Sequence, residues 1–395
     1  MKYNQWTVGL AAAGVVSLAS AVQAEEAKNQ VATAVSGTTL SGYVNTAMRW
    51  NMSSAVGVTQ FLNGANGADG FNLDGVNVTL SKAAGEGDFA AGYKAELLFG
   101  PDVGNLGNGG FAIKQAYINL KAPVGNGLDI KLGVFDSPTG YEVFNAGDNP
   151  NYTRSWGNTI ESTIHTGALL SYALGTDNCV TLTAGVANST DNVINGRVGS
   201  PTQKSYIGGI SITAPESAGA LKGYSVSAFI VDGRTTAAVG GPDTSAVYVG
   251  VSTPEIAERV KLGLAYDTFI RNGLSDAMTL AGYASIKVND KTKIHLRGDY
   301  LDNNGSAIST TAVVPATAPP TVTGGFGNVL AAYNVAATEI LTTTVTLDYS
   351  LWENVLSRLE YRWDHAMSGR QAAGGPFNRG RVNANQLVLN VIYKF

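Results

Sequence analysis

The end of the chain shows a strict alternation of apolar and mostly polar side chains. Every second position is aliphatic or aromatic: Leu387, Leu389, Val391, Tyr393 and Phe395. The polar residues Gln386, Asn390 and Lys394 fall between them. A period of two is that of a β-strand with one apolar face, and the last strand of a membrane barrel closes against the first with that face toward lipid. The pattern therefore predicts that residues 385–395 close a transmembrane β-barrel.

The same alternation recurs along the chain and predicts about 16 strands, an even number within the range of bacterial barrels. The predicted strands are 39–50, 71–82, 88–99, 111–121, 128–134, 159–173, 179–188, 203–214, 222–232, 245–252, 259–270, 276–288, 292–302, 339–350, 355–364 and 385–395. Short connections such as 83–87 and 122–127 alternate with mostly longer ones such as 51–70 and 303–338, and 271–275 is the exception. Short periplasmic turns and long extracellular loops give this asymmetry, with both termini on the periplasmic side. The predicted fold class is an all-β, antiparallel transmembrane barrel.

In one predicted strand the alternation of apolar and polar residues is interrupted. In 111–121, Ala116, Ile118 and Leu120 predict the outward face, and Lys114 then falls on the wrong side. We expect a loop, a β-bulge or a displaced phase at that end of the strand.

The first 24 residues differ from the rest of the chain. Residues 6–22 carry no charge and are rich in Ala, Val, Leu and Gly, and Val22-Gln23-Ala24 forms a plausible cleavage site. This pattern is typical of a secretory signal peptide, and the alternative, an N-terminal transmembrane anchor, is disfavoured by the short length. We therefore expect a signal peptide at 1–24, an N-terminal linker at 25–38 and a barrel at 39–395, located in a bacterial outer membrane.

Composition fits a membrane barrel better than a soluble domain. Charged residues make up 14% of the chain, against roughly 25% in soluble domains. With a formal net charge of −4 and no run of Lys or Arg, the chain lacks the basic patch of a nucleic-acid binder. The single cysteine, Cys179, excludes an intramolecular disulfide. A soluble β-sandwich would be oversized at this length, and no fixed short repeat indicates a β-helix.

Charged residues inside the predicted strands lie on the face opposite the apolar one. In 355–364, Arg358, Glu360 and Arg362 alternate with Leu359 and Tyr361. In a barrel the charged face lines a wet lumen, whereas in a soluble sheet it would be a solvated surface. The predicted pore-lining residues are Arg49, Lys94, Glu96, Lys131, Lys261, Asp267, His295, Arg297, Asp299, Arg358, Glu360, Arg362 and Asp364. Their charges nearly balance, which predicts weak ion selectivity.

The segment 136–158 interrupts the alternation and combines large aromatic side chains with charged ones. Its aromatic residues are Tyr141, Phe144, Tyr152 and Trp156. Its Pro and Gly residues set turns. We expect this segment to fold inward and narrow the pore, with Glu142, Asp148 and Arg154 at the pore constriction. The alternative is a surface loop that packs on its own aromatic side chains.

Three stretches carry a family resemblance. The run 128–135 (LDIKLGVF), the motif Gly140-Tyr141-Glu142 and the run 148–155 (DNPNYTRS) resemble, in this order, the OmpL-like β-barrel porin family. The run 359–365 (LEYRWDH) is similar to the charged penultimate strand of that family. The resemblance covers the mature chain in layout and only these stretches in residues. It implies an outer-membrane porin and carries over no functional residues.

The sequence thus predicts a porin that passes small hydrophilic solutes or ions passively, with no enzymatic reaction, cofactor or metal. His165, His295 and His365 lie on separate elements without metal-ligand spacing, and neither a GxSxG elbow nor a P-loop occurs. The alternatives are a plugged structural or adhesive barrel and a barrel hydrolase that pairs a serine with a histidine across strands. Expected partners are outer-membrane lipid, the solutes and the barrel assembly machinery acting on the Phe395 terminus, and a homotrimer would fit closed symmetry.

Overall fold

The computed structural model describes residues 31–32, 37–52, 69–106, 110–175, 177–198, 202–235, 243–271, 275–304, 339–368 and 382–395. The predicted signal peptide and most of the predicted long loop 303–338 lie outside these residues. None of the described helices is long and apolar enough to cross a membrane.

Sixteen antiparallel strands close into a ring, which confirms the predicted barrel. Each strand pairs with the next along the chain, and the last pairs with the first of the ring. The strands are β2 (Thr39–Asn51), β3 (Gly70–Lys82), β4 (Ala91–Phe99), β5 (Phe111–Ala122), β6 (Leu128–Asp136), β7 (Ile164–Leu174), β8 (Val180–Ala187), β9 (Ser205–Thr213), β10 (Ser225–Arg234), β11 (Asp243–Ser252), β12 (Val260–Arg271), β13 (Ser275–Asn289), β14 (Thr292–Asn304), β15 (Glu339–Trp352), β16 (Val355–Ser368) and β17 (Asn383–Lys394). A two-residue strand, β1 (Val31–Ala32), precedes them and pairs with β2.

The ring closes between β17 and β2, as the alternation at the end of the chain predicts. Leu389 pairs with Met48 and Tyr393 with Val44. The backbones of Gly42 and Phe395 exchange two hydrogen bonds of 2.9 and 3.0 Å. Closure pairs the strand edges, which lipid requires because it offers no hydrogen-bond partners.

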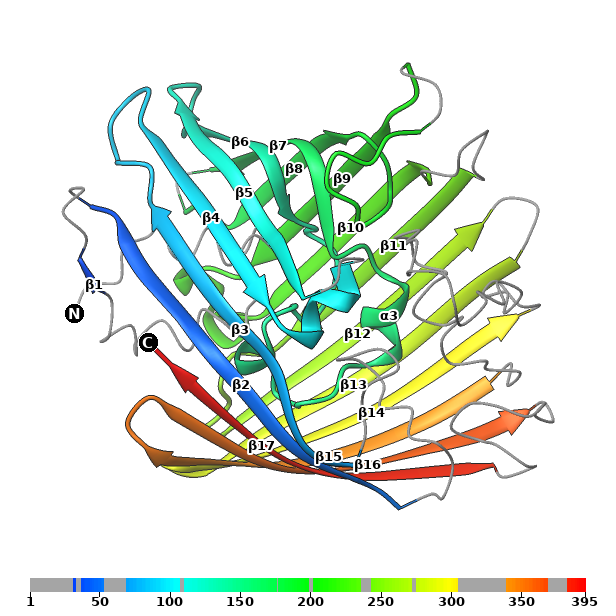
Figure 1. Ribbon diagram of the computed structural model, residues 1–395. Coiled ribbons are helices and arrows are strands. Elements are labelled where there is room, and N and C mark those ends of the chain that lie inside the picture. The colour runs from blue at the N-terminus through cyan, green and yellow to red at the C-terminus, as the bar shows by residue number, and fades with distance from the viewer. Residues whose placement is uncertain are drawn as a thin grey trace.

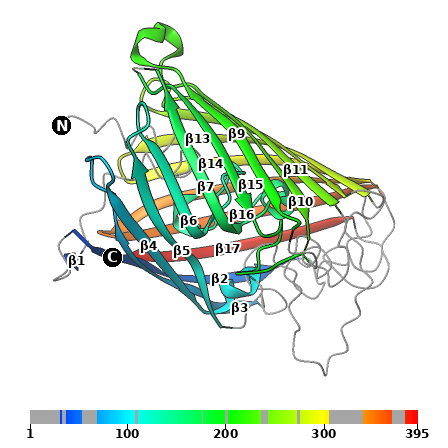
Figure 2. The same cartoon turned by 90° about the horizontal axis from the view of Figure 1, so that it is seen from above.

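The two ends of the barrel differ in their connections. Short turns such as 290–291 and 353–354 join strands at one end, which we refer to as the turn end. The chain finishes there, because Tyr393 of β17 pairs with Val355, the first residue of β16. Figure 2 accordingly places β1 and the C-terminus at the same end of the barrel. The opposite end, the loop end, carries the longer connections, among them the one from β6 to β7.

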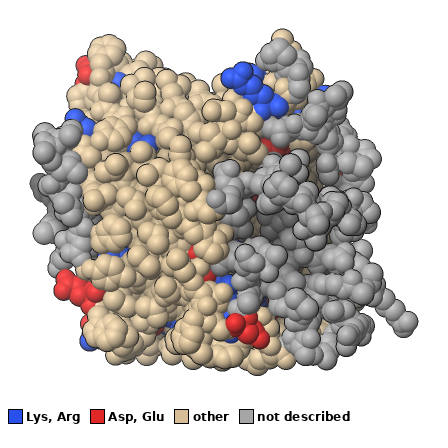
Figure 3. Space-filling view, in the orientation of Figure 1, with Lys and Arg blue, Asp and Glu red and all other residues tan. Residues whose placement is uncertain are grey.

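The outward face of the strands is apolar and the inward face is polar. On β16, Leu359 and Tyr361 are 45% and 41% exposed, whereas Arg358, Glu360 and Arg362 are at most 2% exposed. Among the described residues, the face drawn in Figure 3 shows few Lys, Arg, Asp or Glu side chains. Apolar side chains therefore face the surroundings and ionisable ones face the interior, as the two-residue period predicts.

Strand β10 begins at Ser225 rather than at the predicted 222, and two further predicted strand starts are also wrong. Strand β4 begins at Ala91 rather than at 88, because Phe89 lies in a turn with a φ of +58°. Strand β7 begins at Ile164 rather than at 159, because a short helix, α3 (Trp156–Ile160), occupies the residues before it. The Ser155 side chain caps this helix by accepting from the N–H of Asn158. In both cases the residues alternate like a strand but form a local turn or helix, which the alternation alone does not reveal.

The phase break at Lys114 is a β-bulge. Glu96 of β4 pairs with Gln115 of β5, but the next residue, Leu97, pairs with Ile113. Lys114 is therefore the extra residue of the bulge, and both Lys114 and Gln115 are buried. The bulge turns inward the lysine that a regular strand would have placed in lipid.

Toward the loop end, inward apolar side chains form one cluster around much of the ring. Each strand from β6 to β16 contributes one residue: Phe135, Leu169, Ala187, Ile207, Val231, Ala246, Phe269, Ala277, Leu301, Ile340 and Ala366. Trp156 and Ile160 of α3 pack against this apolar collar. The remaining described helices are short 3-10 turns, η3 (Pro101–Leu106), η4 (Ala146–Asp148) and η5 (Glu216–Leu221).

Candidate pore and internal loop

The connection from β6 to β7, residues 137–163, folds into the barrel, and we refer to it as the internal loop. The N–H of Ser137 donates to the carbonyl of Thr163 (2.9 Å) and closes its base. Its helix α3 contacts β12, β13 and β14 on the far wall, and Figure 1 shows α3 inside the ring of strands. The segment therefore lies where the sequence predicts it.

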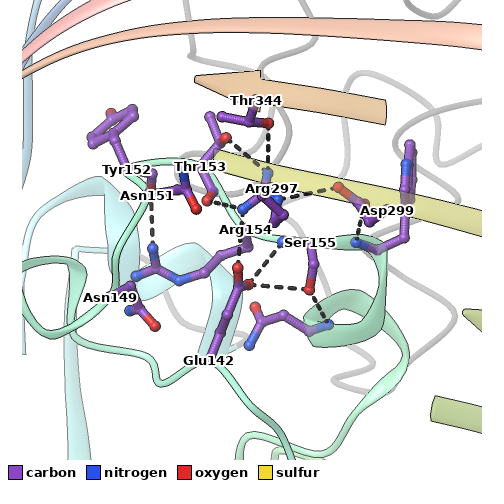
Figure 4. A network of polar contacts seen from close by, with 12 residues as sticks. Glu142, Asn149, Asn151, Tyr152, Thr153, Arg154, Ser155, Arg297, Asp299 and Thr344 are labelled. Atoms are coloured by element: carbon purple, nitrogen blue, oxygen red, sulfur yellow. Dashed lines mark hydrogen bonds and ion pairs between the residues drawn. The ribbon is translucent and has the colours of Figure 1, made fainter. Parts of the chain in front are cut away.

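Arg297 of β14 joins the barrel wall to the internal loop (Figure 4). Its guanidinium donates to Glu142 Oε1 (2.9 Å) and to the carbonyl of Thr153 (2.5 Å). On the wall it donates to Asp299 Oδ2 (3.1 Å) and to Thr344 Oγ1 (3.1 Å). A guanidinium offers five donors in one rigid plane, so a single arginine can bridge the two elements.

Arg358 of β16 holds the first half of the internal loop. It donates to the carbonyls of Ala146 (2.8 Å) and Asn149 (2.7 Å). On the neighbouring strand, Asp348 accepts from its Nε (2.9 Å) and lies 3.2 Å from Nε2 of His295. The arginine thus satisfies two loop carbonyls while its own charge is matched by a wall carboxylate.

The next two inward residues of β16 hold the second half of the internal loop. Arg362 donates to the carbonyl of Arg154 (2.6 Å) and pairs with Asp364 (2.9 Å). Glu360 accepts from two successive backbone N–H groups, those of residues 152 and 153, at 2.6 and 2.9 Å. Alternating arginine and glutamate along one strand therefore match carbonyl and N–H groups along the loop.

Two of the residues predicted at the constriction are enclosed by the loop itself. Glu142 is 4% exposed and accepts from the N–H of Ser155 (2.7 Å) as well as from Arg297. Arg154 is 2% exposed and donates to two carbonyls of the loop at 2.9 and 2.8 Å. Both side chains therefore fix the shape of the loop.

The third constriction residue, Asp148, ties the loop to the closing strand. Lys394 of β17 donates to Asp148 Oδ1 (3.1 Å) and to the carbonyl of Gly147 (3.0 Å). This pair is partly exposed, with side-chain exposures of 35% and 27%. Of the three residues, Asp148 is thus the one whose carboxylate is also in contact with solvent.

A pair of carboxyl groups joins the end of α3 to the wall. Glu161 follows the helix directly and is hydrogen-bonded to Asp267 of β12, which also accepts from Thr279 (3.3 Å). Burial, and then the neighbouring Asp267, raises the pKa of Glu161 well above its ordinary value. Gly140 makes room for this pair, because a Cβ there would lie 2.2 Å from Glu161 Oε2 and its φ is +104°. The glycine of the Gly140-Tyr141-Glu142 motif is therefore required by the geometry.

Strands β4 to β6 carry a further group of inward charges, and Lys114 among them lies 5.3 Å from the ring centroid of Phe144 in the internal loop. Lys114 pairs with Asp136 (2.6 Å) and lies 3.8 Å from Glu96. Glu96 also accepts from Lys94 (2.9 Å) and from Gln115 (2.7 Å). Two lysines therefore share this buried glutamate, and the bulge at Lys114 supplies one of them.

Two aromatic side chains of the interior lie against glycines of the wall. Tyr141 of the internal loop stacks on Tyr283 of β13 with ring centroids 4.1 Å apart. Its hydroxyl is 2.1 Å from the place that a Cβ on Gly263 would take. Phe229 similarly covers Gly209, where a Cβ would lie 2.1 Å from its ring. These glycines let large rings lie against the wall instead of standing in the lumen.

The other predicted pore-lining residues also turn inward. They are Arg49, Lys131 and Lys261, which lie on β2, β6 and β12. Arg49 pairs with Asp74 and donates to the hydroxyl of Tyr152 (2.5 Å), so it too holds the internal loop. In the described part of the chain, no group of three or more His, Cys, Asp or Glu side chains is arranged to hold a metal ion.

The sequence reasoning missed the uncharged polar residues of the interior. Thr342, Thr344 and Thr346 of β15 are completely buried and point inward. Asn151 of the loop donates to Thr346 (2.7 Å), and the indole N–H of Trp156 donates to Thr342 (2.8 Å). The signal was present, because threonine recurs at three successive inward positions of this strand.

A closed ring of antiparallel strands with an apolar outside, an ion-paired inside and an infolded loop is the fold of an outer-membrane porin. The chain belongs to the family described as "Putative beta-barrel porin-2, OmpL-like", whose model matches residues 37–395. The match confirms the family resemblance of the sequence. None of the curated protein sequences is a significant match to this chain.

Solved outer-membrane barrels share the fold at low sequence identity. The outer membrane channel DcaP of Acinetobacter baumannii is 11% identical, with a TM-score of 0.58, over 92% of this chain and 99% of its own. OprB of Pseudomonas putida is 11% identical, with a TM-score of 0.56, over 91% of this chain and 94% of its own. OmpT of Vibrio cholerae is 12% identical, with a TM-score of 0.53, over 93% of this chain and 100% of its own.

Proposed function

We propose that this protein is a channel of the bacterial outer membrane through which small hydrophilic solutes or ions diffuse down their gradients. The observation that carries the proposal is the polarity of the wall, since β16 turns Leu359 and Tyr361 outward and Arg358, Glu360 and Arg362 inward. A soluble sandwich would do the opposite. An interior of ionisable side chains favours water and hydrated solutes over lipid. The proposal includes no reaction and no cofactor.

In this proposal the internal loop sets the size limit of the channel. Glu142, Asp148 and Arg154 keep their predicted role at the constriction. Glu142 and Arg154 would act by holding the shape of the loop, and Asp148 by fixing its tip to Lys394. The support is their position within a loop that the wall arginines hold inside the barrel.

The placement in the cell follows from the same fold. We propose that residues 1–24 direct export, that the turn end faces the periplasm and that the assembly machinery acts on the terminal strand with Phe395. A trimer form is described for OmpT of Vibrio cholerae. We propose a homotrimer for this chain as well, because closed symmetry is the usual rule for oligomers.

Planar-bilayer recording tests the proposal. Purified protein is added to one side of a lipid bilayer under an applied voltage, with heat-denatured protein as the control. We expect stepwise increases of current from native protein alone, because each inserted channel adds one wet path. A bilayer that stays silent although the protein has inserted would contradict the proposal.

The apolar collar favours a second candidate, a plugged barrel. Trp156 and Ile160 of the internal loop pack against collar residues from β6 to β16, so this layer excludes part of the lumen from water. A variant that lacks residues 141–160 separates the two candidates. Silence from the native protein with current from the variant would support the plugged form, and current from both supports the channel.

A further inference from the structure

We propose that the lumen near the turn end is an anion-binding surface centred on Lys131, and that the solutes of this channel are small carboxylates or phosphates. This inference rests on the proposed function, since it names the class of solute for the same lumen. The observation behind it is the distribution of charge along the barrel axis rather than its sum.

Inward lysines gather at one end of the barrel. Five of them lie within the four residues of a strand that are nearest the turn end: Lys94, Lys121, Lys131, Lys261 and Lys293. Lys94 pairs with Glu96, and two more lysines at this end, Lys287 and Lys394, pair with Asp290 and Asp148. The turn end of the lumen is therefore rich in ammonium groups.

Lys131 is the lysine whose surroundings are best suited to an anion. Its ammonium lies 4.9 Å from the ring centroid of Tyr117 on β5. No carboxylate oxygen of the described residues lies within 4.0 Å of it to form an ion pair. The register places Asn119 opposite Lys131 and Lys94 opposite Tyr117. A ring face attracts the ammonium without supplying a negative charge of its own, and the phenol and amide beside it add hydrogen-bond donors.

The lysines also lie on two facing walls. Lys94, Lys121 and Lys131 belong to β4, β5 and β6, whereas Lys261 and Lys293 belong to β12 and β14. Eight strands separate β4 from β12 and β6 from β14 in a ring of sixteen, so the two sets lie across the lumen from each other. A small anion that enters from the turn end would meet ammonium groups on both sides.

Of the interior carboxylates, Glu96 pairs with Lys94 and Asp129 lies opposite Lys121, whereas others are matched away from this surface. Glu142 and Asp299 are paired with Arg297, and Asp348 is paired with Arg358. At the loop end, burial followed by the neighbouring Asp74 raises the pKa of Asp102 to about 8. The net charge of the whole chain therefore does not predict the charge at each end of the lumen. The inward charges nearly balance in sum, but the positive ones gather toward the turn end.

Reversal potentials in a KCl concentration gradient test the proposal on the full-length channel. We expect the native channel to prefer chloride over potassium. Lys131→Gln should lower the chloride-to-potassium permeability ratio about twofold, the effect of one unit charge acting across several ångströms of water. Lys131→Glu should lower it further, and Lys131→Arg should leave it unchanged. Inorganic phosphate, used as the anionic probe, should reduce the chloride current of the native channel more than that of Lys131→Gln.

Lys222→Gln is the matched control, because Lys222 directly follows the short helix η5, has a 57% exposed side chain and pairs with Glu216. We expect no change in its permeability ratio. A native channel that prefers potassium, or a ratio that Lys131→Glu leaves unchanged, would overturn the inference while the channel itself stands. An equal shift from Lys222→Gln would overturn the site. Absence of any current would instead contradict the proposed function.

Discussion

Two segments fold back into this barrel from its loop end, and they are held in different ways. The internal loop, residues 137–163, meets arginines of β14 and β16 that donate to its carbonyls and carboxylates. The helix η3 instead buries Val103 and Leu106 in an apolar cluster with residues of β4 and β5. It also places Asp102 beside Asp74, so that two acids face each other.

The difference shows two ways of burying charge in one lumen. A carboxylate that pairs with a guanidinium stays ionised, and its attachment hardly depends on pH because arginine does not titrate. A carboxyl that faces another carboxyl in a buried place holds its proton instead. The arginine contacts of the internal loop should therefore persist at any physiological pH. The contacts of η3 should weaken as the pH rises, as should the single acid pair of the internal loop, Glu161 with Asp267.

The largest effect should come from breaking the arginine anchor. Arg297→Ala removes the donor to Glu142 and Asp299 and leaves both acids buried without it. Removing one partner of a buried ion pair costs about 3–5 kcal/mol. We expect the free energy of unfolding, measured by urea titration in lipid vesicles, to fall by this amount. Bilayer recordings should show a larger single-channel conductance, because the loop is no longer held at the wall.

Arg234→Ala is the matched control for this prediction. Arg234 also pairs with an aspartate, Asp243, but the two side chains are 32% and 50% exposed. An exposed pair contributes at most about 1 kcal/mol. Equal losses from the two variants would contradict the view that burial makes the Arg297 anchor strong.

A smaller effect should distinguish η3 from the internal loop: the pH dependence of the free energy of unfolding that Asp102 causes. Burial and the charge of Asp74 raise the pKa of Asp102 from 3.8 to about 8. The native state then binds a proton that the unfolded state releases, so the stabilisation is full below the ordinary pKa and is lost as the pH rises through about 8. We expect the free energy of unfolding to fall by about 2–3 kcal/mol between acidic and alkaline buffer, the scale of a buried ion after relaxation.

Asp102→Asn keeps the shape of the side chain and removes the titration. The variant should lose less stability than the native protein over the same pH range, with urea unfolding at each pH as the measurement. The anchor at Arg297 supplies the contrast, since Glu142→Gln should not flatten the pH dependence. If Asp102→Asn leaves the profile unchanged, the two segments do not differ in the way that their charges indicate.

The strands and their inward and outward faces could be predicted from the sequence, for a physical reason. A two-residue period is local, so the outward Tyr361 and the inward Arg362 can be read from their neighbours alone. The contacts of Arg154 are not local. Its carbonyl accepts a hydrogen bond from Arg362, which is far away in the sequence, and its side chain donates to loop carbonyls. The bulge at Lys114 was partly predictable. The break in alternation is visible in the sequence, but the form of the bulge depends on the pairing with β4.

The smallest effect concerns one of the apolar contacts of the internal loop, that of Tyr141 with the wall. Tyr141 rests on Gly263 of β12 and stacks on Tyr283. Gly263→Ala would place a methyl group 2.1 Å from the Tyr141 hydroxyl, so the ring must move. Overpacking of this kind costs about 1–3 kcal/mol, and we expect the lower end because the ring belongs to a loop.

Gly282→Ala gives the control for this seat, one strand away and on the outer face. A Cβ at Gly282 meets nothing within 4 Å, so the free energy of unfolding should stay within about 0.5 kcal/mol of the native value. Tyr141→Leu should restore part of the stability lost in Gly263→Ala, because it removes the hydroxyl that the new methyl group meets. Additive losses in the double variant would show that the two residues do not share this contact. The internal loop would then depend on its arginine contacts and on the packing of α3 against the collar, and not on the contact of Tyr141 with Gly263.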